Sequence, residues 1–484
     1  MRTAITACSL ALLAGSAMGQ TTRTILETDA SGSRVLSQHT RVFVSNEARP
    51  GIAEDLLWTY FDVASIPNSA AIGAGGDEAW VGHSLNDQRI SKFTVASGNT
   101  PDLMYSLLAE APANMGVAAA SNGALGAVIS QSSSGVVTAR GFSAAGGSTP
   151  LWTYTFGTGY NEVRNRSIAI NADGSRVAVC AYDGADTLLV ILDGDGNELN
   201  STTVAGFALS LDMDDSGNRV VVTAGAIARL YDTNTMTQEY ALSVSGAGGW
   251  ARISRDGSAI ADGGFNVRAA REIEGVWQVA YSGTGTTDWF GAVSLSADGQ
   301  TLFAVSHDYA SGYLINDHRI VDLNTSTVIA SSGFTGSGSF QNSVVSSEVN
   351  ADGTVFVAAT WGDQANTQPE IRVYDRGLNM IDSLDTDGSP FAMDLSQDGS
   401  RIVVSTKSVH ANTFGNGGAT QVYDLDVAPP CLADVNHDGS VTPADFSAWV
   451  AAFNTMAPEC DQNGDGSCTP ADFSAWVANF NAGC

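Results

Sequence analysis

The chain has 484 residues, more than one hydrophobic core usually organises, so it forms either several domains or one large repeat architecture. Its 52 glycines, 12 prolines and 15% charged residues, with 44% apolar content, exclude global disorder, collagen and coiled coil and favour many short strands joined by tight turns. The formal net charge of −29 repels phosphate backbones and anionic head groups, so nucleic acid is not an expected partner.

Residues 1–19 have the layout of a secretory signal peptide. Arg2 supplies a positive start, residues 4–14 form an apolar region, and Ala17-Met18-Gly19 offers a small-x-small cleavage site before Gln20. The apolar stretch is too short to span a membrane, and no later segment has eighteen uninterrupted apolar residues. We therefore expect an exported chain without a transmembrane segment, either secreted or associated with the cell surface.

A repeated unit fills the body, which we place at residues 20–428. An apolar stretch leads into a turn, mostly of the form x-Asp-Gly-x, and then into a β-branched strand. The turn glycines recur with a mean period near 46 residues: Gly76, Gly123, Gly174, Gly217, Gly257, Gly299, Gly353 and Gly399. Each unit predicts four strands, clearest at 167–170, 176–181, 187–192 and 199–204.

This period and strand content are typical of four-stranded propeller blades, and the unit resembles WD40-like or YVTN-type β-propellers over most of the body. We predict a mainly β fold with eight blades. Seven is the alternative, because the first units are degenerate and residues 23–46 are unassigned. The last unit stops after its third strand at Asp424, and residues 55–61 look like a fourth strand. An N-terminal strand would therefore complete the last blade and remove the open sheet edge.

Ligands of such a fold are expected on one face, here called the interblade face. It carries the loops between second and third strands and the loops that lead to the next blade, whereas the Asp-Gly turns lie on the opposite face. The interblade loops carry aromatic residues in nearly every unit: Tyr160, Phe207, Trp250, Trp289, Phe290, Phe340 and Phe391. We predict ligand binding for Trp250, Trp289, Phe290, Phe340 and Phe391. The alternative is that these rings are wedges between blades.

Catalytic signatures are weak. His83, His307 and His410 follow second strands and would share the interblade face, where they offer either a metal or acid–base site or isolated surface histidines. The sequence contains no nucleophile elbow, P-loop, H-E-x-x-H motif or paired-carboxylate signature. We therefore expect no catalytic residues in the body.

The C-terminal module, residues 431–484, contains two twelve-residue calcium loops 27 residues apart. Calcium prefers six to eight hard oxygens, which such loops supply from positions 1, 3, 5, 7, 9 and 12 around a turn glycine at position 6. The predicted metal ligands are Asp434, Asn436, Asp438, Ser440, Thr442 and Asp445 in the first loop, and Asp461, Asn463, Asp465, Ser467, Thr469 and Asp472 in the second. Gly439 and Gly466 occupy the turns.

Each loop leads into a helix. Pro443 occupies the first helical position of the first copy, and Phe446, Trp449, Val450 and Phe453 form an apolar stripe that the second copy repeats. We expect the two stripes to pack against each other. A loop with one exit helix, duplicated and ending in Gly-Cys, resembles the type I dockerin and the GC-type anchors of planctomycete-like bacteria.

The resemblance implies a noncatalytic tether that binds two calcium ions and a receptor. Cohesin-binding dockerins commonly carry a Ser/Thr-type pair at loop positions 10 and 11, whereas this chain has Pro-Ala at 443–444 and 470–471. The expected partner is therefore a cohesin-like module or another cell-surface receptor. Residues 429–430, Pro-Pro, form the linker.

Four of the six cysteines lie in this module, which agrees with an oxidising compartment. Three pairings are possible, and we favour Cys431 with Cys484 and Cys460 with Cys468. The sequence thus predicts an exported, tethered propeller that binds a glycan or protein. The alternative is an extracellular polysaccharide lyase, glycoside hydrolase or lactonase carried by the same tether.

Overall fold

The computed structural model describes most of the chain: residues 18–28, 34–44, 55–63, 65–86, 88–110, 114–246, 249–284, 288–336, 343–362, 368–410, 417–425, 433–436, 441–455, 457–460, 462 and 468–482. It divides into two units, residues 1–53 and 54–484. In the first, β1 (Met18–Thr28) pairs antiparallel with β2 (Arg34–Val44) in a hairpin that we did not predict. Most of the predicted signal peptide, residues 1–17, lies outside the described residues.

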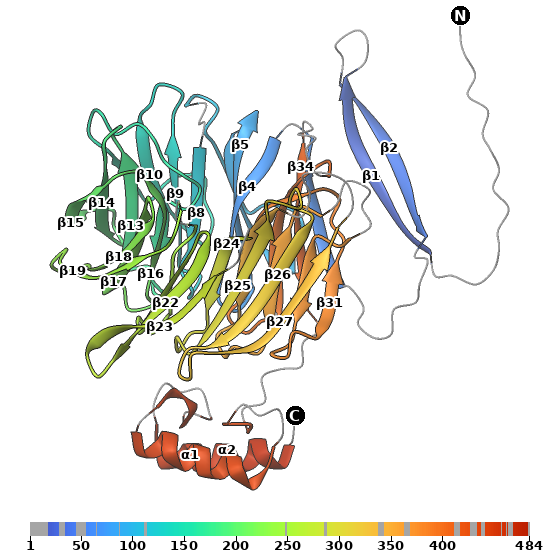
Figure 1. Ribbon diagram of the computed structural model, residues 1–484. Coiled ribbons are helices and arrows are strands. Elements are labelled where there is room, and N and C mark those ends of the chain that lie inside the picture. Colours follow the sequence, from blue (N-terminus) through green and yellow to red (C-terminus); the bar gives the residue numbers. More distant parts are fainter. Residues whose placement is uncertain are drawn as a thin grey trace, which may run out of the picture. The chain divides into compact units, whose positions relative to one another are not determined.

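Eight four-stranded antiparallel sheets make the body of the second unit an eight-bladed propeller, as the period predicted, and exclude the seven-bladed alternative. Figure 1 shows first strands such as β8 and β24 inside and fourth strands such as β19 and β27 outside. Blades 1 to 4 are β4–β7 (Ser65–Ile72, Glu78–Asn86, Arg89–Thr94, Leu103–Ser106), β8–β11 (Asn114–Ala119, Leu125–Gln131, Val137–Ser143, Trp152–Thr155), β12–β15 (Ile168–Ile170, Arg176–Tyr182, Asp186–Asp193, Glu198–Ala205) and β16–β19 (Ala208–Met213, Arg219–Ala224, Ile227–Asp232, Gln238–Ser243). Blades 5 to 8 are β20–β23 (Arg252–Ile253, Ala259–Gly263, Asn266–Ile273, Val276–Thr284), β24–β27 (Asp288–Leu295, Thr301–Asp308, Ile315–Asp322, Thr327–Thr335), β28–β31 (Val344–Val349, Phe356–Thr360, Ile371–Tyr374, Met380–Leu384) and β32–β34 with β3 (Pro390–Leu395, Arg401–Lys407, Gly418–Asp424, Asp55–Asp62).

Turn chemistry explains the repeated hairpins. All eight turn glycines have positive φ, between 63° and 76°, a region that glycine enters without Cβ strain. In six of the eight turns, the residue three positions before the glycine has a short polar side chain. This side chain accepts a hydrogen bond from the backbone N–H at the start of the second strand. Asn171 accepts from Arg176 at 2.9 Å, and Ser254 accepts from Ala259 at 2.9 Å. The Asp-Gly aspartates and their polar neighbours are therefore structural.

Blade 8 closes the ring as predicted. Strand β3 pairs with β34 from Asp55 opposite Asp424 to Asp62 opposite Gly418, so the N-terminal strand supplies the outer edge of the last blade. The Trp58 indole N–H donates to the Val95 carbonyl at 3.0 Å and its ring lies 5.0 Å from that of Phe93, which attaches this strand to blade 1.

A second closure joins the Asp-Gly turns of neighbouring blades. One backbone hydrogen bond links each turn to the next, with N–O distances between 2.7 and 3.1 Å. The eight bonds are Ala74 to Ser121, Asn122 to Ala172, Ala172 to Asp215, Asp215 to Arg255, Asp256 to Ala297, Ala297 to Ala351, Ala351 to Gln397 and Gln397 to Ala74. The first blade thereby accepts from the last, and the ring is complete.

The C-terminal module contains the two predicted exit helices, α1 (Pro443–Thr455) and α2 (Pro470–Ala482). Trp449 and Trp476 are buried in a small core with Val435, whereas Phe446 and Phe473 remain 40% and 43% exposed. The stripe therefore buries only in part, because two short helices cannot cover all four positions of each stripe. In the described part of the chain, no helix has the length and apolarity that crossing a membrane requires.

Candidate functional site

The first strands of the eight blades line a central channel with a cavity of about 230 Å³. One position of the repeat, five residues before each turn glycine, lines the channel in every blade. In blades 1 to 8 it holds Ala71, Ala118, Ala169, Asp212, Arg252, Ser294, Glu348 and Asp394. Our sequence analysis missed these residues, although aligning the units on their glycines would have shown four charges at one inward position.

Charged side chains cross the channel. Arg252 Nη2 contacts Glu348 Oε1 at 2.5 Å, and the Arg166 guanidinium donates to Ser346 Oγ at 3.1 Å. Burial raises the pKa of Asp394 to about 7, and repulsion from Glu348 adds to the effect. Both Asp394 oxygens accept backbone N–H groups, from Ile72 of blade 1 at 2.8 Å and from Leu395 at 3.0 Å. These contacts hold blades together.

Side chains also cross the channel at its Asp-Gly end. Arg255 and Gln397 both donate to Ser121 Oγ, at 3.2 and 2.7 Å, although they belong to blades 5 and 8 and the serine belongs to blade 2. Arg255 also contacts Asp215 Oδ1 at 3.3 Å. These contacts join blades 2, 4, 5 and 8 at that end of the channel.

A pocket of about 240 Å³, here called the mouth pocket, lies on the interblade face. Its walls come from blades 3 to 7: Arg164, Asn165, Leu209, Gly249, Trp250, Trp289, Gly291, His307 and Val344. Asn165 and Trp250 also line the central channel. The Arg166 guanidinium stacks on Trp250, 4.0 Å from the ring centroid. Two of the predicted ligand-binding residues, Trp250 and Trp289, therefore share one pocket.

An aromatic cluster extends from Trp289. Its ring contacts Phe265 and Tyr309 edge-on, with centroids 5.1 and 6.2 Å away, and Tyr309 lies 5.0 Å from Tyr313. Phe265 and Tyr309 come from loops between second and third strands and are 47% and 41% exposed. Neither residue was predicted from the sequence, because the prediction of ligand-binding rings rested on the loops between blades alone.

Two other predicted ligand-binding rings, Phe290 and Phe391, lie outside the mouth pocket. Phe290 is fully buried against the neighbouring blade, which contradicts its prediction, because adjacent residues of a strand point to opposite sides. Phe391 is half-buried beside Trp361, with centroids 5.9 Å apart, and lines the channel rather than the mouth pocket. Phe340 lies outside the described residues.

The three predicted histidines belong to different local networks. His83 is buried in blade 1, where its Nδ1 lies 3.1 Å from Ser65 Oγ and 3.3 Å from Asp62 Oδ2. Both partners meet the same ring nitrogen, whereas a nucleophilic relay needs them on opposite nitrogens. His410 Nδ1 contacts the buried Glu370 at 3.0 Å.

His307 alone lies at the mouth pocket. Its Nδ1 accepts the Val344 N–H at 3.3 Å, and burial lowers its pKa to about 4. The ring is therefore neutral at neutral pH and carries its proton on Nε2.

The position-12 carboxylates of the two predicted calcium loops, Asp445 and Asp472, are fully buried. Asp445 accepts the backbone N–H of Thr442 at 2.7 Å and of Asn436 at 3.2 Å, and Asp472 accepts those of Thr469 at 2.7 Å and Gln462 at 3.0 Å. Each carboxylate thus joins the two ends of its own loop, because it accepts one N–H from position 9 and one from position 3 in the first loop or position 2 in the second. Asp434 is buried as well. Asp438, Ser440, Asp461, Asn463, Asp465 and Ser467 lie outside the described residues.

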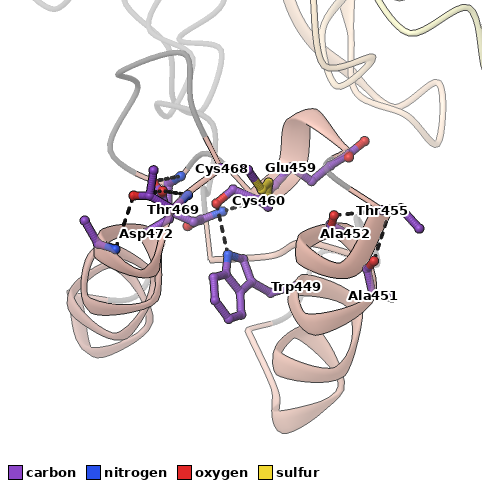
Figure 2. Close-up of a disulfide and its surroundings, with 11 residues drawn as sticks. Trp449, Ala451, Ala452, Thr455, Glu459, Cys460, Cys468, Thr469 and Asp472 are labelled. Atoms are coloured by element: carbon purple, nitrogen blue, oxygen red, sulfur yellow. Dashed lines mark hydrogen bonds between the residues drawn. A yellow bond between two sulfur atoms is a disulfide. The ribbon is translucent and has the colours of Figure 1, made fainter.

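A disulfide joins Cys460 to Cys468, as we predicted, and encloses the start of the second predicted calcium loop. Figure 2 shows it between the two helices, with the Trp449 indole N–H donating to the Cys460 carbonyl at 3.2 Å. Val441 occupies the equivalent of Cys468 in the first loop, so only the second loop has this cross-link. Cys431 and Cys484 lie outside the described residues.

Comparison with known proteins identifies the fold. No family model and no curated protein matches the sequence. Two solved structures of Sqt1 from Chaetomium thermophilum, a WD40-type propeller, are similar to this chain at 13% identity, with TM-scores of 0.55 and 0.54. They cover 77% and 78% of this chain and 100% of Sqt1, which one structure shows bound to the N-terminus of ribosomal protein L10.

Proposed function

We propose that this chain is an exported, noncatalytic binding protein that holds a polymeric ligand at the mouth pocket and is anchored through its C-terminal module. The observation that carries the proposal is the convergence of Trp250, Trp289 and His307 on one pocket. Aromatic faces beside a few polar groups are the usual composition of a ligand site. The exposed rings of Phe265 and Tyr309 continue this surface, so a ligand longer than the pocket still finds contacts.

Channel chemistry favours binding over catalysis. Asp394, whose pKa burial raises to about 7, is the strongest candidate for an acid–base group. Its two oxygens already accept backbone N–H groups, and Glu348 already pairs with Arg252. The Sqt1 structure also supports binding, since that propeller holds a protein segment.

The test uses the immobilised full chain and a panel of soluble polysaccharides and unfolded proteins. We expect retention of a ligand without release of products. Replacing both Trp250 and Trp289 by Ala should abolish retention and change the melting temperature little, since both rings are half-buried at the surface. Trp277→Ala is the matched control, because Trp277, on the outer strand of blade 5, stacks on Tyr240 of blade 4 and does not line the mouth pocket. Unchanged retention by the double variant, or product release by the wild-type chain, would contradict the proposal.

The anchoring half of the proposal rests on the duplicated loop. Calcium supplies a hard cation that gathers the loop oxygens, and the matching geometry of Asp445 and Asp472 fits that role. A cohesin-like or other cell-surface receptor is the proposed partner. N-terminal sequencing of the extracellular protein tests export, with Gln20 expected as the first residue and an intact Met1 as the contrary result.

A further inference from the structure

The mouth pocket offers hydrogen-bond donors and few acceptors. The side chains of Arg164, Asn165 and His307 line it, and its walls contain no Asp or Glu among the described residues. Arg164 is nearly half exposed, pairs with Glu162 at 3.2 Å and stacks on Phe207 at 4.6 Å. In a chain with only 22 basic residues and a net charge of −29, an exposed Arg beside Asn165 favours an oxygen-rich ligand group, which would share the Arg164 guanidinium with Glu162.

His307 forms a buried part of the pocket wall. With Nδ1 accepting from Val344, the proton lies on Nε2, which has no hydrogen-bond partner among the described residues. The side chain is 8% exposed. The Nε2 atom has almost no accessible surface, and the ring packs edge-on against Tyr309 and Tyr313, so His307 shapes the pocket wall rather than offering a donor to a ligand.

The size of the pocket indicates one ring of a longer chain. Its volume of about 240 Å³ is below the range for a drug-sized molecule. Trp250 and Trp289 supply flat apolar surfaces, and one face of Trp250 is fixed by the Arg166 guanidinium. A pyranose ring has an apolar C–H face for such surfaces and oxygens along its edge for the donors, whereas a short acidic side chain matches only the donors.

We propose that the mouth pocket binds a uronic acid residue of an acidic polysaccharide, with the sugar ring against the tryptophans and the carboxylate facing Arg164 and Asn165. The inference rests on the proposed function and names the ligand class. The negative charge of the whole chain repels such a polymer at long range. Retention therefore depends on the short-range contacts in the pocket.

The test compares a tetramer of galacturonic acid with its methyl ester, which keeps the ring and removes the charge. Calorimetry uses the full chain in EDTA, so that calcium does not bridge the tetramer to other carboxylates. The acid should bind at least tenfold more tightly than the ester. Arg164→Gln should reduce this preference to threefold or less and leave ester binding unchanged. Arg271→Gln is the matched control: Arg271 pairs with Asn324 outside the mouth pocket, and the variant loses the same charge.

Other outcomes separate the two proposals. Equal affinity for acid and ester, or an unchanged preference in Arg164→Gln, overturns the uronate assignment. If Trp250 and Trp289 still matter for another ligand in that case, the proposed function stands. Tighter binding of a hexameric glutamate peptide than of the tetramer also overturns the assignment, in favour of an acidic protein. If no probe binds and the double tryptophan variant retains every ligand of the wild type, both proposals fail.

Discussion

Asp262 should make the propeller less stable as pH rises from 4 to 7. Its carboxyl is fully buried in β21, accepts the Gly263 N–H at 2.8 Å and the Thr223 hydroxyl at 3.1 Å, and has no cation among its hydrogen-bond partners. Burial raises its pKa from 3.8 to about 7, against the hydrogen bonds that lower it. The folded chain therefore binds a proton that the unfolded chain releases near pH 4.

The magnitude follows from this difference. About three pH units at 1.36 kcal/mol each give a loss of about 4 kcal/mol in the free energy of unfolding between pH 4 and pH 7. Asp262→Asn keeps the shape and cannot ionise, so it lacks this contribution. The variant should gain stability relative to the wild type as pH rises, by about 4 kcal/mol in total.

Urea unfolding at half-unit steps from pH 4 to pH 8 measures the difference between the two chains, which cancels the titration of all other groups. The exposed Asp195→Asn serves as control and should follow the wild type at every pH. Parallel curves for wild type and Asp262→Asn would refute the reasoning.

The position of Asp262 also matters for the mouth pocket. The carbonyl of the neighbouring Gly263 accepts the N–H of Gly249, which is a wall residue of that pocket.

Three further predictions concern the closing strand and the C-terminal module. Trp58→Ala should lower the free energy of unfolding by about 3–5 kcal/mol, because it removes a nearly buried indole that attaches β3 to blade 1. Urea unfolding measures this loss, and an unchanged midpoint would contradict the prediction. Calorimetry of the full chain should show about two calcium sites, and Asp445→Asn or Asp472→Asn should each remove one of them. If the double variant still binds two calcium ions, the two loops are not the binding sites. Cys468→Ser should weaken calcium binding at the second loop only, since the first loop has Val441 there, and equal weakening of both sites would argue against local preorganisation.

The fold was predictable because local chemistry repeats in register with it. Each turn glycine has the positive φ that an Asp-Gly hairpin requires, so their spacing gave the blade count. The closing strand was also predictable, because an incomplete last unit and an extra N-terminal strand must pair to remove an open edge.

The candidate site was predictable only in part. Trp289 and Phe290 are sequence neighbours with the same chemistry, yet one lines the mouth pocket and the other is buried between blades. Which ring faces solvent depends on the register of β24, where the pairing shifts between Phe290 and Ala292. The charged channel residues come from four different blades, and Arg252 and Glu348 meet only because the ring closes. Their contact depends on tertiary structure and has no local signal.

The closing strand also determines how a mechanical load would pass through the molecule. Any pull on the segment that follows Asp424 enters the propeller through β34, which lies between β33 and β3 in the sheet. It is paired at seven positions on each side. A force along the strand runs perpendicular to these antiparallel hydrogen bonds, so both ladders share the load and must shear together. If the chain were anchored at its C-terminus and a bound ligand pulled on it, the force would thus act first on β34, which is hydrogen-bonded along both edges.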